Sequence, residues 1–276
     1  MSVSPDRALA RRLGAAEAAA GIWCQEALER VRPGAGGDVE RLAGGTIAFA
    51  GIASPLTRVR GIGMAGPVSE EEVDRLERFY ESRGVSPSIP ICPYADPTLL
   101  EHLGRRGYSV TDFDNVLVRP VAGAAPAPEL PEGMRVARAG AADQDAWARV
   151  VAQGFGGAEE VTEEAIDMGR LIFHEPRAAG FWAHVDGRLA GGGAMANHDG
   201  LASFFGASTR TELRGRGVQR ALLEARLAHA AALGCDLASV VTAPGSASQR
   251  NAERAGFRVV YTRVTVARSP ARAPGA

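Results

Sequence analysis

Two Asp-Gly dipeptides, Asp186-Gly187 and Asp199-Gly200, restrict the fold of this chain more than any other feature. Asp-Gly between alternating apolar segments favours the type I′ turn of a tight β-hairpin. Apolar residues alternate over 181–185 before the first turn, residues 189–195 lie between the turns, and residues 201–209 follow the second. The pattern predicts three consecutive antiparallel strands, with a bulge expected at the triple glycine of the middle strand.

Helical and strand-like patterns alternate around this meander. A strand is predicted over 134–139, and the apolar spacing that follows is helical. The remaining elements are a helix over 141–154, a second helix within 156–173, a long helix over 218–233 ended by Gly234, a strand over 237–242, a short helix up to Ala255 and a strand over 258–266. The expected order is β-α-α-β-β-β-α-β-α-β.

The amino-terminal segment repeats part of this order. Ser4-Pro5 predicts a helix start, with Ser as N-cap and Pro in the first turn. Ser69 and Glu72 form a capping-box pattern at the start of a helix that runs to about Ser82. Further elements are strands over 46–52, 57–62, 88–92 and 109–118 and a helix over 97–106. The phrases EHLGRRGYSV and NAERAGFRVV precede similar strands, which predicts an internal duplication.

A Pro- and Ala-rich stretch, 121–133, divides the chain of 276 residues. Three prolines exclude a helix or central strand there, so we expect a linker. The predicted division is a domain over 1–120, the linker 121–133, a second domain over 134–268 and a disordered tail over 269–276. Each domain is long enough to bury its own core.

Composition excludes several classes of protein. The net charge is −1 and all 31 basic residues are Arg, so there is no electrostatic case for nucleic-acid binding and no catalytic Lys. Apolar runs are too short to span a membrane, and the N-terminus does not resemble a secretory signal. Cys24, Cys92 and Cys235 are isolated, and the histidines lack metal-ligand spacing. We therefore expect a cytoplasmic protein without a metal.

The segment Arg214-Gly215-Arg216-Gly217 lies between a predicted strand and a predicted helix. Glycines let main-chain N–H groups approach an anion, and the first turn of a helix offers unpaired N–H donors and a positive dipole end. These features together predict a diphosphate-binding loop. The alternative is a surface turn in an Arg-rich chain. The loop is neither a Walker A motif nor a dinucleotide-binding fingerprint.

With its neighbours, this loop resembles the GCN5-related N-acetyltransferase (GNAT) superfamily. The matching residues are 207–209 on the preceding strand, 214–223 in the loop and helix, and Ser248 with 251–257 near the end. Gln219 departs from the small residue of the family pattern. The resemblance covers 134–268, and the first domain looks like a degenerate copy, with Ala65-Gly66-Pro67-Val68 at the loop position.

The resemblance implies a mixed α/β fold with two GNAT-like lobes, each a mostly antiparallel twisted sheet with a central splay flanked by helices. It implies an acyl-CoA co-substrate, acetyl-CoA above all, in the splay of the second lobe, and no CoA in the first. The implied binding residues are Ala207, Ser208, Thr209, Arg214, Gly215, Arg216, Gly217, Val218, Gln219, Arg220 and Asn251.

The implied reaction is direct attack of an amine on the thioester, with a small molecule as acceptor and a monomer or homodimer as the enzyme. The family's usual acid, a Tyr, is replaced by Ala252. Ser248 and Ser246 are the candidate acids, and the alternative is that they cap a helix. Tyr261 is a weaker candidate. Two other functions stay open: acyl-CoA binding without catalysis, and thioester chemistry such as malonyl-CoA decarboxylation.

Candidate bases are carboxylates, and ordered water is the alternative to them. One group lies on the predicted second helix of the 134–268 domain, and the other lies on the strand before the linker. They are Glu163, Glu164 and Asp167 in the first group and Asp112 and Asp114 in the second. Of Phe204 and Phe205, alternation predicts that one lies in the core and the other faces the acceptor.

Overall fold

The computed structural model describes residues 4–121, 130–157 and 159–268. Most of the predicted linker and the whole predicted tail 269–276 lie outside the described residues. The chain falls into two compact units. Unit 1 comprises Arg30–Pro33 and Val116–Val259, and unit 2 comprises Ser4–Glu29, Gly34–Asn115 and 260–268. Residues 260–268 thus group with unit 2, whereas the predicted second domain extends through 268.

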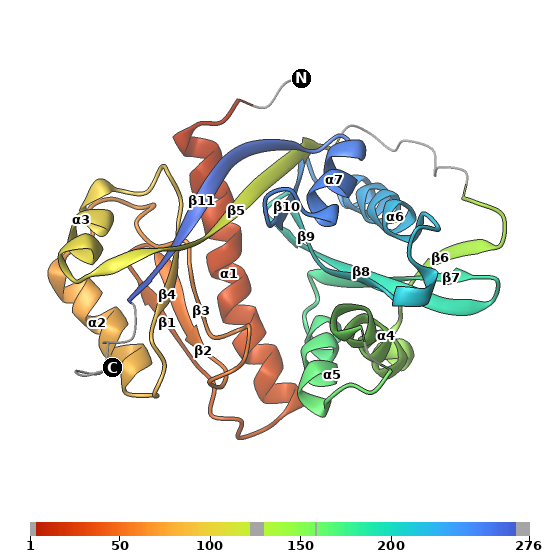
Figure 1. The fold of residues 1–276 in the computed structure, drawn as a ribbon, viewed down its shortest axis with the longest axis horizontal. Coiled ribbons are helices and arrows are strands. Elements are labelled where there is room, and N and C mark those ends of the chain that lie inside the picture. Colours follow the sequence, from red (N-terminus) through yellow and green to blue (C-terminus); the bar gives the residue numbers. More distant parts are fainter. Residues whose placement is uncertain (1–3, 122–129, 158, 269–276) are drawn as a thin grey trace, which may run out of the picture. The chain divides into compact units, whose positions relative to one another are not determined.

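Unit 1 contains the predicted order of elements (Figure 1). The elements are β6 (Met134–Arg138), α4 (Gln144–Gly156), α5 (Glu163–Arg170), β7 (Ala178–Val185), β8 (Arg188–His198), β9 (Leu201–Thr209), α6 (Val218–Ala232), β10 (Leu237–Thr242), α7 (Ala247–Arg254) and the first two residues of β11 (Arg258–Arg268), whose remainder belongs to unit 2. Short 3-10 turns cover Ala141–Asp143, Leu171–His174 and Thr211–Leu213.

The two Asp-Gly turns form as predicted. Asp186 and Gly187 both have positive φ (52° and 77°), as do Asp199 and Gly200 (47° and 78°), which is the backbone of a type I′ turn. The turns join β7, β8 and β9 into an antiparallel meander. With β5 (Tyr108–Pro120), these strands lie in the order β11-β5-β10-β9-β8-β7-β6, and β10 pairs with β9 in parallel.

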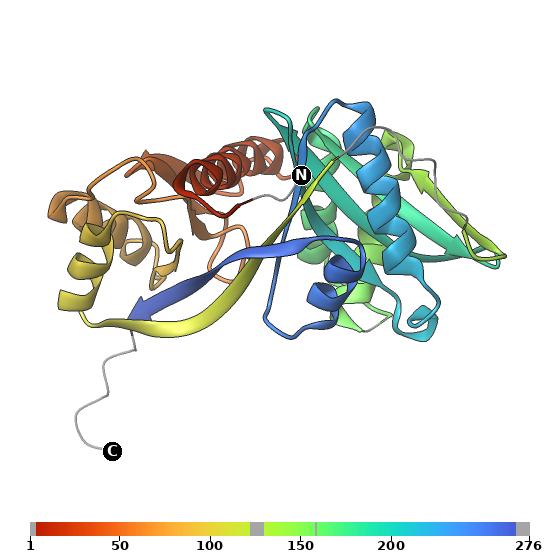
Figure 2. The same ribbon diagram turned by 90° about the horizontal axis from the view of Figure 1, so that it is seen from above.

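Helices cover both faces of the meander. Helices α4 and α5 lie on one face, and α6 and α7 lie on the other (Figures 1 and 2). Trp147 of α4 is fully buried and donates its indole N–H to the Phe181 carbonyl at 2.8 Å. On the opposite face Leu222 of α6, Phe204 of β9 and Phe257 share one apolar core. The position of β9 is therefore fixed from both sides.

Unit 2 contains the predicted helices and most of the predicted strands. Its elements are α1 (Arg7–Val31), β1 (Asp38–Leu42), β2 (Gly45–Phe49), β3 (Arg58–Arg60), α2 (Glu70–Glu81), β4 (Ser88–Ile91), α3 (Pro97–Arg105) and the first part of β5 (Tyr108–Pro120). The Ser69–Glu72 capping box is confirmed. The predicted cap of the first helix is wrong: Asp6, not Ser4, accepts the Leu9 N–H at 2.8 Å. Strand β1 was not predicted.

The sheet of unit 2 is interrupted between two neighbouring strands. β3 belongs to the β1-β2-β3 sheet and β4 to the sheet that contains β11 and β5, although β3 and β4 lie side by side. This break is the central splay expected of a GNAT-like lobe. No helix in the described part of the chain is long and apolar enough to cross a membrane.

Candidate functional site

Strands β9 and β10 separate part-way along their length. Their parallel register runs from Leu201–Leu237 to Phe204–Val240 and stops there, so residues 205–209 continue without a β10 partner in that register. On its other edge, β9 has a bulge against β8: Ala194 pairs with Phe205 and Gly192 with Ser208. Beyond Phe204, main-chain groups on the β10 side of β9 are thus left for another partner.

The glycine loop lies at the end of β9 where this splay is open. Gly215 and Gly217 have φ of 77° and 83°, which a residue with a Cβ adopts only with strain. Among the described residues, a Cβ at Gly215 would meet no atom within 4 Å, and one at Gly217 would meet only Pro131 Cγ, at 3.8 Å. Gly217 is the N-cap of α6 and supplies no side-chain acceptor. The first-turn amides of α6 therefore receive no hydrogen bond from an N-cap side chain.

Side chains of the loop hold it against β9 and α4. Arg214 Nε donates to the Thr209 carbonyl at 3.3 Å, and its Nη2 donates to the Gly154 carbonyl at 3.0 Å. Gln219 Nε2 donates to Thr209 Oγ1 at 2.8 Å, so this longer side chain turns towards β9. The departure of Gln219 from the family pattern thus has a local explanation: its amide anchors the first turn of α6.

The other predicted cations of the loop are on the surface. Arg216 forms an exposed ion pair with Asp186 at 2.8 Å. Arg220 is exposed and forms no ion pair with a described residue. Val218, by contrast, is buried in the core, so it can contribute only its main chain.

The predicted β9 residues point to opposite faces of the sheet. Ser208 is buried, and its Oγ donates to the Val151 carbonyl of α4 at 2.8 Å. Thr209 contacts Gln219 on the α6 face. A Cβ placed on Gly193 would lie 3.3 Å from Ala207 Cβ on that same face. Ala207 and Thr209 therefore face α6, whereas Ser208 is committed to α4.

The predicted acid residues lie at the start of α7. Ser246 is the N-cap of this helix, and its Oγ accepts the Gln249 N–H at 3.1 Å. Ser248 is exposed, Asn251 accepts a hydrogen bond from Arg254, and Ala252 is buried. The capping role predicted as the alternative is thus present for Ser246. The catalytic role of either serine stays a prediction.

Most of the predicted bases are engaged in ion pairs or local hydrogen bonds. Asp167 pairs with Arg32 and Arg170, and Glu163 also contacts Arg170. Asp114 pairs with Arg263 in unit 2. Asp112 accepts the N–H of the next residue, Phe113. The pKa of exposed Glu164 is lowered by a hydrogen bond from its own main chain and another from Thr162.

Two further side chains near the splay were not predicted. Arg226 of α6 is 2% exposed, and its Nε and Nη1 donate to the carbonyls of Leu222 and Ala194. Burial lowers the pKa of the Arg226 guanidinium to about 9, so it stays protonated at neutral pH. Thr242 of β10 is 5% exposed, and its Oγ1 has no hydrogen-bond partner among the described residues. Arg226 was detectable in the sequence as a cation on the apolar face of a helix, between Leu222 and Ala230.

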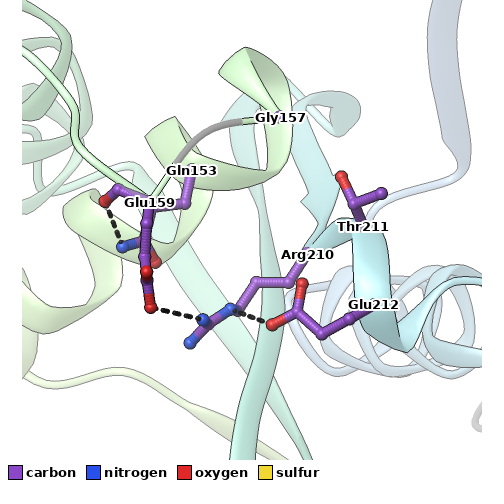
Figure 3. A pocket seen from close by; sticks show the side chains of 6 residues that line it. All are labelled: Gln153, Gly157, Glu159, Arg210, Thr211 and Glu212. Carbon is purple, nitrogen blue, oxygen red and sulfur yellow. Dashed lines mark hydrogen bonds and ion pairs between the residues drawn. The ribbon is translucent and has the colours of Figure 1, made fainter.

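A hollow of about 270 Å³ lies beside the glycine loop (Figure 3). It is lined by Gln153, Gly157, Glu159, Arg210, Thr211 and Glu212. Arg210 pairs with Glu212 at 2.8 Å and with Glu159 at 3.9 Å. The charged side chains that line the hollow therefore form ion pairs with one another. None of the four residues of the glycine loop lines it.

The corresponding loop of unit 2 has a different chemistry. Val68 N–H donates to Thr98 Oγ1 at 2.8 Å, and Pro67 has no N–H to offer. Ser69 accepts the Glu72 N–H at the start of α2, and Glu70, Glu71 and Glu72 place three carboxylates in its first turn. Both the capped amide and the negative charge oppose an anion at this helix end.

Residues 146–257 match the model of the acetyltransferase (GNAT) family. This segment is a GNAT domain, and the resemblance inferred from the loop and its neighbours is confirmed. The match supports acyl-transfer chemistry. No curated protein matches the sequence.

Solved structures share the fold over nearly the whole chain. A GCN5-related N-acetyltransferase from Kribbella flavida is similar with a TM-score of 0.64 at 19% identity, over 94% of this chain and 96% of that one. One from Sphaerobacter thermophilus has a TM-score of 0.58 at 19% identity, over 96% and 94%. A tandem GNAT protein from the clavulanic acid biosynthesis pathway has a TM-score of 0.61 at 16% identity, over 98% of both chains. The predicted mixed α/β fold with two GNAT-like lobes is confirmed.

Proposed function

We propose that this protein is an acyl-CoA-dependent N-acyltransferase that moves an acyl group, acetyl in the simplest case, to the amine of a small molecule. The observation that carries the proposal is the glycine loop at the start of α6. Its N-cap, Gly217, offers the first-turn amides of α6 no side-chain acceptor, and the loop follows the point where β9 and β10 stop pairing. The match of residues 146–257 to the GNAT family supports the same chemistry.

The residues present fit a CoA thioester. The main chain of Gly215, Gly217 and Val218 would hold the diphosphate, and Arg216 and Arg220 would add positive charge at its edge. Ala207 and Thr209 present the β9 main chain along the splay, and Thr242 has a buried hydroxyl without a partner on the opposite strand. When bound, the co-substrate supplies an activated acyl carbonyl.

The protein's own part is to position the thioester and move protons. Ser246 uses an oxygen lone pair to cap α7, which leaves its hydroxyl proton free to be donated, so capping does not conflict with a role as acid. Ser248 is exposed one turn before Ala252. Because most of the candidate carboxylates are occupied in ion pairs or local hydrogen bonds, we propose that ordered water takes the proton of the amine.

The proposal predicts that only the loop in unit 1 binds CoA. Titration calorimetry of the full chain with CoA should give one site, and thiol release from acetyl-CoA should increase with at least one amine of a broad panel. A wild-type protein that binds no CoA would refute the proposal.

A second candidate function is acyl-CoA binding without transfer, which Ala252 favours. Its methyl side chain is 2% exposed and carries no proton for the leaving thiolate. Tight CoA binding without thiol release on any amine would support this second function against the first.

A further inference from the structure

We propose that Arg226 selects an acyl donor whose acyl group ends in a carboxylate, so that the preferred co-substrate is the CoA thioester of a dicarboxylic acid. The inference rests on the proposed function, because it assumes that a CoA thioester binds along β9. It adds the chemical class of the acyl group, which neither the family nor the fold specifies.

Helix α6 returns antiparallel to β9, and two contacts fix how the two elements lie together. Gln219, in the first turn of α6, contacts Thr209 at the end of β9. Arg226, two turns further along α6, has its Cζ 4.8 Å from the centre of the Phe204 ring. Residues 205–209 of β9, which pair with β8 but have no β10 partner, lie between these two contacts. The glycine loop is therefore at the open end of the splay, and Arg226 is at its closed end, where Phe204 still pairs with Val240.

This placement decides which end of a CoA thioester Arg226 would meet. With the diphosphate at the glycine loop and the pantetheine arm along β9, the acyl end points towards the closed end of the splay. Arg226 lies on the α6 face, whereas α5, which carries the candidate bases Glu163, Glu164 and Asp167, lies on the opposite face with α4. The geometry thus assigns Arg226 to the acyl donor and not to the acceptor.

The charge of Arg226 is not neutralised within the protein. Its two hydrogen-bond acceptors are the main-chain carbonyls of Leu222 and Ala194, and no carboxylate among the described residues forms an ion pair with it. Burying a cation without a counter-ion costs folding free energy. A neutral hydrogen-bond donor would be enough to satisfy the two carbonyls. A carboxylate brought in by the substrate would remove that cost and gain charge-assisted hydrogen bonds.

The guanidinium of Arg226 packs closely against the glycine bulge of β8. A Cβ at Gly193 would lie 3.1 Å from Arg226 Cζ, so glycine at this bulge is what admits the side chain. Ala207, on the same face, contributes only a methyl group. Thr242 adds a second polar group on the other strand of the splay, two residues beyond Val240 and therefore on the same face of β10. A cation and an unpaired hydroxyl at one end of an otherwise apolar core fit an acyl chain with a polar terminus.

Calorimetry of the full chain with thioesters of matched length tests the assignment without any variant. Succinyl-CoA and butyryl-CoA have acyl chains of equal length, as do malonyl-CoA and propionyl-CoA, and each pair differs in the terminal carboxylate. We expect the charged member of at least one pair to bind about tenfold tighter or more, as for a hydrogen-bonded charge. Equal affinities within both pairs, with CoA itself bound, would overturn the inference and leave the proposed function standing. A wild-type chain that binds no CoA would remove both.

Two variants then locate the effect. Arg226→Met keeps a long apolar side chain and should bring the two members of each pair within threefold of each other, whereas Arg226→Lys should keep part of the preference. Arg220→Met removes a cation from the loop end of the same helix and should weaken all thioesters by one common factor. A preference that survives in a folded Arg226→Met protein would also overturn the inference. If Arg226→Met fails to fold, the affinities of the wild type and of Arg226→Lys for the two thioester pairs still test the inference.

Discussion

Replacing Gly217 with glutamate tests the diphosphate site by placing a carboxylate at the start of α6. The backbone there has a φ of 83°, so any residue with a Cβ is strained by roughly 1–2 kcal/mol. The new side chain would meet little else, since Pro131 Cγ is the only described atom within 4 Å of a Cβ at this position. The substitution is thus mainly an electrostatic perturbation of the loop.

The size of the effect follows from the charges. Two unit charges 4 Å apart repel by about 1 kcal/mol in water and by about 4 kcal/mol at an effective dielectric constant of 20. A diphosphate near the new carboxylate should lose roughly 3 kcal/mol of binding free energy, which is on the order of a hundredfold in Kd. Titration calorimetry with CoA measures this loss directly.

Gly234 provides a matched control at the other end of the same helix. It has a φ of 72°, and a Cβ there would meet no atom within 4 Å. Gly234→Glu therefore introduces the same strain and the same charge, far along α6 from the loop. Its CoA affinity should stay within about twofold of the wild type.

Thermal unfolding separates binding from stability in this pair. An acidic group stabilises a helix start and destabilises a helix end by about 0.3–1 kcal/mol, so Gly217→Glu should be the more stable variant despite being the weaker binder. Equal CoA affinities for the two variants would refute the assignment of the diphosphate to this loop.

Three further predictions concern the supporting structure. Ser246→Ala should lower the free energy of unfolding by about 1 kcal/mol through loss of the α7 cap, while Ser248→Ala should change it by less than about 0.5 kcal/mol in urea denaturation. Trp147→Phe leaves the Phe181 carbonyl without its indole donor and should cost about 1–3 kcal/mol in the same assay; a loss under 0.5 kcal/mol would contradict that role. Burial, with the Arg138 charge, lowers the pKa of His229, so the neutral form is favoured in the folded state and stability should fall as the pH drops below about 6.5. In the His229→Phe variant, the urea midpoint should depend less on pH between pH 6.5 and 5 than in the wild type. An unchanged pH dependence would rule out His229 as the cause of the stability loss.

The meander and the loop were predictable because local chemistry determines them. Asp-Gly at 186 and 199 requires a backbone that few other dipeptides adopt, and Gly217 directly before an Ala- and Leu-rich run marks a helix start. Such signals depend on a few adjacent residues, so distant contacts rarely override them. The capping box at Ser69 was predictable for the same reason.

What the sequence could not supply is the partner of each polar side chain. Gln219 departs from the family pattern in the sequence, and its contact with Thr209 depends on a loop returning to a strand ten residues earlier. Arg226 lies among alanines and leucines in the sequence, and that its charge lacks a carboxylate is visible only from the assembled core. The N-cap of α1 was misplaced because Ser4 and Asp6 are both suitable N-cap residues. They lie two residues apart, so the sequence pattern alone does not say which of them starts the helix.

The helix starts of α6 in unit 1 and α2 in unit 2 differ in the chemistry that they offer an anion. In both, a helix begins beside a splayed pair of strands. At α6 the N-cap is Gly217, which leaves the first-turn amides unpaired and contributes no charge. At α2 the N-cap is Ser69, an amide of the first turn is already bonded, and three glutamates reverse the sign of the local potential. Since every α-helix has the positive end of its dipole at its N-terminus, the difference between the copies lies in a few side chains at the helix start, and we expect that exchanging those residues would exchange the affinity for a diphosphate.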